Sequence, residues 1–328
     1  MNLLLIMPKF FDYPQIIQQE LEKMGYHVDF FDDRPSTNNW VKAIIRVNKN
    51  FINGYIKKYF RQIMNTIHGK EYDVVLLISG QSLSFSEGMI KQLRDSLPKA
   101  RFILYQWDAL KNFPYIKNMF PYFDVRFSFD KNDVEQNNDL RFLPLFYHQT
   151  YAEIGAFQQK EYQYDCSYVG TAHPKKYESI NKMSFALKDA LPRQFIYHYM
   201  PSKLKFFYHK MRDKEYKRAK FKEFETQKLS TQDIVDLIKK SRCVLDAPQG
   251  GQMGLTMRTM ECLGAKRKLI TTNSDIRHYD FYNESNILIF DDSINFNSPF
   301  FTNSYQDIPE EVYEKYSLKS WLNTMLNA

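Results

Sequence analysis

The feature that most constrains the fold is a regular alternation of short apolar runs with helical segments. The clearest run is YDVVLLIS at 72–79, which is continuous and rich in β-branched residues. Such a run is typical of a strand buried on both faces, as the strands of parallel sheets are. The chain also opens with an apolar run at 3–7, a helical segment at 14–24 and a second apolar run at 27–31. This β-α-β order predicts a parallel sheet with helices on its faces.

The alternation occurs twice along the chain, on either side of a polar stretch at 150–164 that we interpret as a linker. Further strands are expected at 101–106, 125–129, 140–145, 166–169, 195–199, 243–246, 269–272 and 287–290. We therefore predict an α/β protein with two doubly wound Rossmann-like domains facing a central cleft. The expected domains are residues 1–150, residues 151–308 and a helical tail over 309–328, and 328 residues suit two domains.

Composition excludes several classes of protein. With 44% apolar and 16% aromatic residues the chain can form packed cores. We find no apolar run long enough to span a membrane, and the start MNLLLIMPKFF lacks the basic head of a signal peptide. The three cysteines are widely spaced and form no C-x-x-C pair, which argues against a zinc site or a disulfide framework. A reducing cytoplasm is therefore expected.

Positive charge is concentrated in one segment. Between Pro201 and Lys222 nine basic residues face two acidic ones, an excess equal to the net +7 of the whole chain. Because the remainder is balanced, we predict that the protein does not bind nucleic acid. Apolar and aromatic residues are interleaved with the lysines. Residues 201–224 are therefore either a contact for an anionic membrane surface or a solvated basic helix packed by its aromatics.

The segment DAPQGGQMGLTMRTMECLG at 246–264 predicts a strand, a glycine loop and a helix. A helix N-terminus offers unpaired amides and the positive end of the helix dipole, so it is a natural seat for a phosphate. Arg258 could bind a diphosphate and Glu261 the hydroxyls of a ribose. The alternative is a simple turn in which Arg258 and Glu261 form an internal ion pair. The loop glycines, which let a backbone approach an anion, are Gly250, Gly251 and Gly254.

Two familiar nucleotide motifs do not fit this loop. A Walker A loop requires Lys followed by Ser or Thr after its last glycine, but Leu255 and Thr256 follow Gly254. A dinucleotide fingerprint should open the first β-α-β unit, yet residues 7–10 read MPKF and contain no glycine. P-loop hydrolysis and NAD-dependent hydride transfer therefore both lose support.

Three segments carry a resemblance to a known superfamily: DCSYVGT at 165–171, GLTMRTME at 254–261 and LITTN at 269–273. With them the second half of the chain, over most of 165–292, resembles GT-B glycosyltransferases. It is most similar to the bacterial CgeB-like and group 1 enzymes that build surface polysaccharides. The first half offers a weaker match, YQWD at 105–108.

The resemblance implies that the C-terminal domain holds a nucleotide diphosphate sugar, with a UDP-sugar expected first, and that the N-terminal domain holds a glycan or lipid-linked acceptor. With the cysteine pattern and the basic segment at 201–224, we expect a cytoplasmic enzyme, or one peripheral on the inner face of the membrane. The resemblance also implies no obligatory metal and no other cofactor, because Arg258 and the helix N-terminus would neutralise the leaving diphosphate. Adjacent aspartates at 32–33 and 291–292 are accordingly not interpreted as metal ligands.

Such enzymes often carry two glutamates eight residues apart around this loop. Glu261 matches the second, but Met253 stands where the first would be, so Gln249 or Gln252 would supply the polar contact. At the end of the strand at 166–169, turn amides could bind the pyrophosphate, with His173, Lys175 or Lys176 adding charge; a plain turn is the alternative. The predicted donor-binding residues are Gly170, Thr171, His173, Gln249, Gly250, Gly251, Gln252, Gly254, Leu255, Thr256, Arg258 and Glu261.

An inverting transfer needs a base that deprotonates the acceptor hydroxyl. Asp108 and Asp12 both follow predicted strands of the first domain, and Asp108, which follows Trp107, is favoured. Each is alternatively an ordinary loop aspartate. Other functions compatible with these features are a nucleotide-sugar 2-epimerase, a polyol-phosphate transferase and a non-catalytic two-lobed binding protein. The sequence leaves open the sugar, the nucleotide base, the acceptor, the stereochemistry and the oligomeric state.

Overall fold

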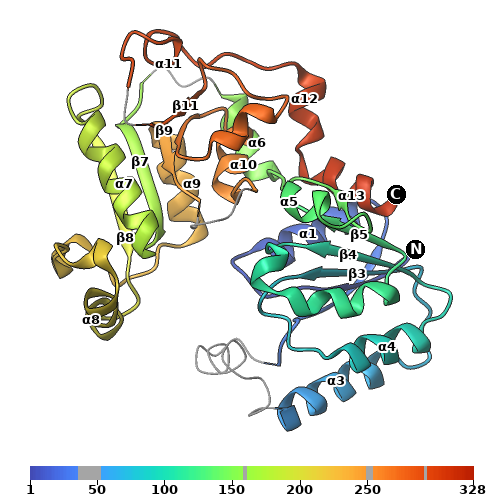
Figure 1. Ribbon diagram of the computed structural model, residues 1–328. Coiled ribbons are helices and arrows are strands. Elements are labelled where there is room, and N and C mark those ends of the chain that lie inside the picture. The colour runs from blue at the N-terminus through green and yellow to red at the C-terminus, as the bar shows by residue number, and fades with distance from the viewer. Residues whose placement is uncertain (36–52, 158–160, 249–253, 292–293) are drawn as a thin grey trace. The chain divides into compact units, whose positions relative to one another are not determined.

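The computed structural model describes residues 1–35, 53–157, 161–248, 254–291 and 294–328 (Figure 1). By its internal contacts the chain divides into two compact units. The first comprises Met1–Pro144 and Leu318–Ala328, and the second comprises Leu145–Ser317. The sequence places the boundary at 150 and separates a tail from 309. In the structure the last eleven residues, 318–328, instead belong to the first unit, where the Trp321 and Tyr105 ring centroids are 4.6 Å apart.

The first unit contains a six-stranded sheet in the order β2-β1-β3-β4-β5-β6, and each neighbouring pair is parallel. Its strands are β1 Asn2–Ile6, β2 His27–Phe31, β3 Val74–Ser79, β4 Arg101–Gln106, β5 Val125–Ser128 and β6 Arg141–Phe142. Its helices are α1 Tyr13–Lys23, α3 Asn53–Ile67, α4 Glu87–Ser96, α5 Lys131–Glu135 and α13 Leu318–Leu326, with 3-10 turns η2 Leu110–Asn112 and η3 Pro114–Tyr122.

The predicted central strand is confirmed. All six residues of β3 are buried, as expected for a strand covered on both faces. On one face α3 and α4 pack their apolar stripes against the sheet (Figure 1). On the other, α1 packs against α13. Helix α3 begins directly after residues 36–52, which lie outside the described part of the chain.

The second unit contains a five-stranded sheet in the order β11-β10-β9-β7-β8, again with parallel neighbours. Its strands are β7 Tyr164–Thr171, β8 Gln194–Tyr199, β9 Ser241–Asp246, β10 Lys268–Thr271 and β11 Ile287–Ile289. Its helices are α6 Gln149–Ala156, α7 Pro174–Leu187, α8 Lys203–Arg212, α9 Thr231–Lys240, α10 Met257–Gly264, α11 Pro299–Thr302 and α12 Glu310–Lys315, with 3-10 turns η4 Lys214–Tyr216, η5 Phe221–Glu223 and η6 Ser274–His278. Among the described residues no helix has both the length and the apolarity needed to cross a bilayer.

The prediction of a linker at 150–164 is wrong for the first half of this stretch, because helix α6 forms there. Tyr151 and Ile154, three residues apart, are buried by this helix. Gly155 lets α6 approach α10 closely: a Cβ at Gly155 would lie 2.4 Å from the carbonyl oxygen of Gly264. Helix α6 has only eight residues, and a pattern this short does not predict a buried helix face from the sequence.

Each sheet has a position where the direction of strand addition reverses. In the first sheet it lies between β1 and β3, and in the second between β7 and β9. Open parallel sheets bind ligands just beyond the carboxyl ends of the strands at such a switch point. A ligand site in the second unit is therefore expected at the segments that follow β7 and β9.

Candidate functional site

A buried carboxylate stands at the switch point of the second sheet. Asp246 is the last residue of β9 and is almost wholly buried. Its Oδ1 lies 3.1 Å from Nζ of Lys176 on α7, and its Oδ2 accepts a hydrogen bond from the Thr256 hydroxyl. Asp246 therefore ties the first turn of α7 to the residue that precedes α10. The positive ends of both helix dipoles consequently lie around one short stretch of the sheet edge.

Thr256 is the N-cap of α10. Its hydroxyl oxygen accepts the amide of Thr259 at 3.3 Å while donating to Asp246. The amides of Met257 and Arg258 come earlier in the first turn, where backbone donors have no acceptor within the helix. The Thr256 hydroxyl proton is thus donated to the Asp246 carboxylate. An anion placed at the start of α10 would be offered the first-turn amides.

Arg258 and Glu261 form the internal ion pair that the second interpretation of this segment predicts. Nη1 of Arg258 lies 2.6 Å from Oε2 of Glu261, and both side chains are largely buried. Burial lowers the pKa of the Arg258 guanidinium, but the Glu261 charge outweighs it and the pKa is raised overall. Burial, with Glu261 as its neighbour, also raises the pKa of Tyr151 on α6. In this structure Glu261 holds a charged arginine against the first turn of α10.

Tyr168 on β7 contributes a polar group that sequence reasoning missed. Its side chain is buried, and its hydroxyl has no hydrogen-bond partner among the described residues. Burial raises the Tyr168 pKa, with Asp246 adding to the effect, so the phenol stays neutral. A Cβ at Gly170 would lie 2.3 Å from this hydroxyl oxygen. Gly170 is therefore required by the close approach of a side chain.

The remaining predicted donor-binding residues differ in their solvent exposure. Thr171 ends β7 and is exposed, and the His173 amide donates to its carbonyl oxygen at 2.9 Å just before α7. Gly254 and Leu255 are buried ahead of the Thr256 cap. Four predicted residues lie outside the described part of the chain: Gln249, Gly250, Gly251 and Gln252.

The structure thus brings Thr256, Arg258 and Glu261 together at the start of α10, next to Lys176 of α7. Asp246 and Tyr168 were not predicted. A signal existed for Asp246, because a lone carboxylate ending a buried apolar run is costly unless it has a partner. No sequence pattern indicates the role of the Tyr168 hydroxyl, since tyrosine is common in strands.

In the first unit, Asp108 follows β4 and closes a turn that follows β3. Its Oδ2 accepts the Gln81 amide at 2.9 Å, and a Cβ at Gly80 would lie 2.7 Å from the same oxygen. This contact fits the loop-aspartate interpretation of Asp108. Asp12, which precedes α1, is exposed, and its carbonyl oxygen accepts the Ile16 amide.

The loop after β2 carries a buried cluster of ionisable side chains, of which the sequence shows only the adjacent aspartates. Asp33 is wholly buried and accepts the Ser82 hydroxyl at 2.6 Å. Nε of Arg34, also buried, lies 3.7 Å from Asp33 Oδ1 and 3.6 Å from Asp32 Oδ1. Burial raises the pKa of Asp33 to about 8, although Arg34 and Ser82 act to lower it. The cluster joins the loop after β2 to the loop after β3.

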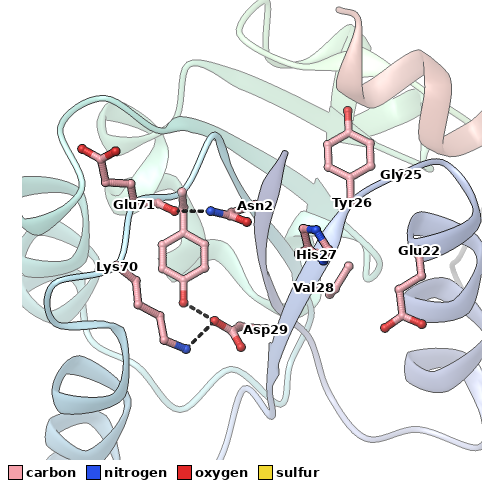
Figure 2. A pocket seen from close by; sticks show the side chains of 10 residues that line it. Asn2, Glu22, Gly25, Tyr26, His27, Val28, Asp29, Lys70 and Glu71 are labelled. Atoms are coloured by element: carbon pink, nitrogen blue, oxygen red, sulfur yellow. Dashed lines mark hydrogen bonds and ion pairs between the residues drawn. The ribbon is translucent and has the colours of Figure 1, made fainter.

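A pocket of the first unit lies at the opposite end of its sheet. Figure 2 shows Asn2 and His27, the first residues of β1 and β2, along its wall, together with Asp29 in the middle of β2. There Lys70 Nζ donates to the Asp29 carboxylate at 2.8 Å, and the Tyr72 hydroxyl donates to the same oxygen. Because open α/β sheets bind ligands at the carboxyl ends of their strands, we do not assign the candidate site to this pocket.

Solved structures share this architecture over the whole chain. A glycosyltransferase from Rickettsia africae is 13% identical with a TM-score of 0.57, covering 99% of this chain and 97% of its own. HepE from Anabaena, in complex with UDP and glucose, is 10% identical with a TM-score of 0.57 and 100% coverage of both chains. An α-glucosyltransferase in complex with UDP and DNA is 12% identical with a TM-score of 0.55, covering 100% of this chain and 90% of its own.

The protein therefore has the GT-B fold, and the predicted fold class is confirmed. At these identities the likeness establishes the fold alone. No protein-family profile matches the sequence, and no curated protein matches it. The similarity to CgeB-like enzymes stays a prediction.

Proposed function

We propose that the protein is a metal-independent glycosyltransferase that moves a sugar from a nucleoside diphosphate sugar, in the first instance a UDP-sugar, to a glycan or lipid-linked acceptor. The second unit would bind the donor and the first unit the acceptor. The observation that carries the proposal is the start of α10, which follows the switch point of the second sheet with Lys176 and Arg258 beside it.

The charge arrangement supports a diphosphate ligand. The amides of Met257 and Arg258 would donate hydrogen bonds to the anion, and the helix dipole adds roughly half a positive charge at this end. Lys176 and Arg258 carry full charges, each now balanced by a carboxylate of the protein. A bound diphosphate would compete for these cations. Donors placed in this way stabilise a leaving diphosphate as charge develops on it, without a metal ion.

For the acceptor base we keep Asp108 and Asp12 as the two candidates. Asp12 is exposed, whereas one oxygen of Asp108 is already engaged by the Gln81 amide. Asp12→Asn and Asp108→Asn are therefore compared for sugar transfer and for UDP affinity. The variant at the base should lose transfer by about a hundredfold or more and bind UDP as the wild type does.

Product analysis separates this proposal from its alternatives. The protein is incubated with UDP-sugars, with and without a membrane or glycan acceptor fraction, and the products are resolved by chromatography. We expect UDP release that rises with acceptor and a labelled glycoconjugate. Conversion of the donor into an epimer without acceptor would replace the transferase assignment with an epimerase. Nucleotide binding without hydrolysis or transfer would indicate a non-catalytic binding protein.

A further inference from the structure

Helix α8 turns an apolar stripe toward solvent. Leu204, Phe207, Tyr208 and Met211 are spaced i, i+3, i+4 and i+7, so they lie on one face of the helix. Their side chains are 82%, 55%, 48% and 80% exposed. A surface helix ordinarily turns such a stripe toward the core. Figure 1 shows α8 at the outer end of the second unit, beyond β8 and α7.

The opposite face of α8 is fixed to the unit. Phe206 is buried in an aromatic cluster with Tyr216 and Phe224. Nζ of Lys210 donates to the carbonyl oxygen of Ala219 at 2.7 Å, which joins the helix to the segment that follows it. Because these contacts determine the rotation of the helix, the outward direction of the stripe is part of the fold.

The segment that carries the stripe is rich in cations. The stretch from Pro201 to Lys222 carries nine Lys and Arg residues, and one of its two acids, Asp213, is paired with His209. Most of these cations are exposed, among them Lys203, Arg212, Lys214, Lys217, Arg218, Lys220 and Lys222. The exposed side chains of α8 and of the segment that follows it therefore carry a strong positive charge, in a chain whose other charges balance.

We propose that α8 docks this unit on an anionic lipid bilayer, with the four stripe residues inserted at the interface and the flanking cations on the lipid headgroups. Apolar insertion and a polybasic flank are the two signals that together hold a peripheral protein on a membrane. A second copy of the chain fits less well, because a two-fold contact would bring two such positive surfaces together. The inference does not depend on the donor or on the reaction.

Vesicle flotation tests the proposal with the whole protein. We expect binding to phosphatidylcholine vesicles that contain phosphatidylglycerol, weak binding to phosphatidylcholine alone, and partial release by salt. Leu204→Ser/Phe207→Ser/Met211→Ser should lower the partition coefficient on anionic vesicles by at least about tenfold. Lys203→Gln/Lys214→Gln/Lys217→Gln should lower it comparably. The matched control is Phe185→Ser on α7, which removes a 71% exposed phenylalanine from the same unit and should change nothing.

Further measurements separate a loss of membrane binding from unfolding, from a loss of UDP binding and from a change in oligomeric state. The urea midpoint and the affinity for UDP should be the same in the serine variant and the wild type, so that lost flotation cannot come from unfolding or from failure of the proposed function. Wild-type protein that stays off anionic vesicles, or a serine variant that floats equally well, would overturn the proposal. A dimer in sedimentation velocity that the serine variant abolishes would also overturn it, in favour of a second copy on this face.

Discussion

Nη1 of Arg258 and Oε2 of Glu261 are 2.6 Å apart, three residues from each other on α10 and largely buried. The pair explains how a cation is kept at the start of this helix before any ligand arrives. It also means that removing one partner leaves the other as an uncompensated charge in a buried place.

The first prediction concerns this pair. Arg258→Met should lower the free energy of unfolding by about 3 kcal/mol, because it strands the Glu261 carboxylate. Arg258→Met/Glu261→Gln should recover most of that loss. Urea unfolding of the two variants and the wild type measures the effect. A single variant as stable as the wild type would show that the pair is not buried as described.

The second prediction concerns Gly170. Gly170→Ala places a Cβ 2.3 Å from the Tyr168 hydroxyl oxygen and should cost about 1–3 kcal/mol of stability through overpacking. Tyr168→Phe alone should cost little, because that hydroxyl has no partner to lose among the described residues. The double variant should recover part of the alanine penalty. Thermal unfolding of all three tests this, and an unchanged Tm in Gly170→Ala contradicts it.

The third prediction is a loss of stability in acid that originates at His198. Burial lowers its pKa from 6.5 to about 4, so the folded state binds fewer protons between these values than the unfolded state does. The contribution is present above about pH 6.5 and is lost as the pH falls toward 4, by up to about 3 kcal/mol. His198→Phe should flatten this part of the profile in urea titrations. His278→Asn, at an exposed histidine, should leave it unchanged.

The fourth prediction has the opposite sign and lies in the first unit. Burial raises the pKa of Asp33 from 3.8 to about 8, so the folded state binds more protons than the unfolded state in this window. Its contribution is complete below about pH 4 and is lost as the pH rises through 8, with a slope of at most about 1.4 kcal/mol per pH unit. Asp33→Asn should remove that slope. Asp95→Asn, at an exposed aspartate on α4, is the control and should retain it.

The order of strands and helices followed from the sequence because buried parallel strands leave continuous apolar runs. His27–Phe31 and Arg101–Gln106 have the predicted bounds. Packing between segments is indicated only weakly by local sequence patterns. Helix α6 was missed because only Tyr151 and Ile154 mark its buried face, and α13 joins the first unit through contacts of Trp321 that no local pattern encodes.

The candidate site was predicted in part for the same reason. Glycines before a helix and an arginine within its first turn are a local pattern, so Thr256 and Arg258 could be found. The link from Lys176 to Asp246 spans seventy residues, and the contact of Tyr168 with Gly170 depends on side-chain direction. Such relationships follow from strand order and from packing, which the sequence does not state.

The most direct test of the account is calorimetric titration of UDP into wild-type protein and into Arg258→Met/Glu261→Gln, the variant designed to keep the fold. We predict saturable binding of UDP by the wild type, and a loss of affinity of about tenfold or more in the variant, whose charged contact to the diphosphate is removed. GDP and CDP, titrated alongside, report the preference for the base. Absence of binding by all three nucleotides, or equal affinity in the wild type and the variant, would contradict a diphosphate site at the start of α10.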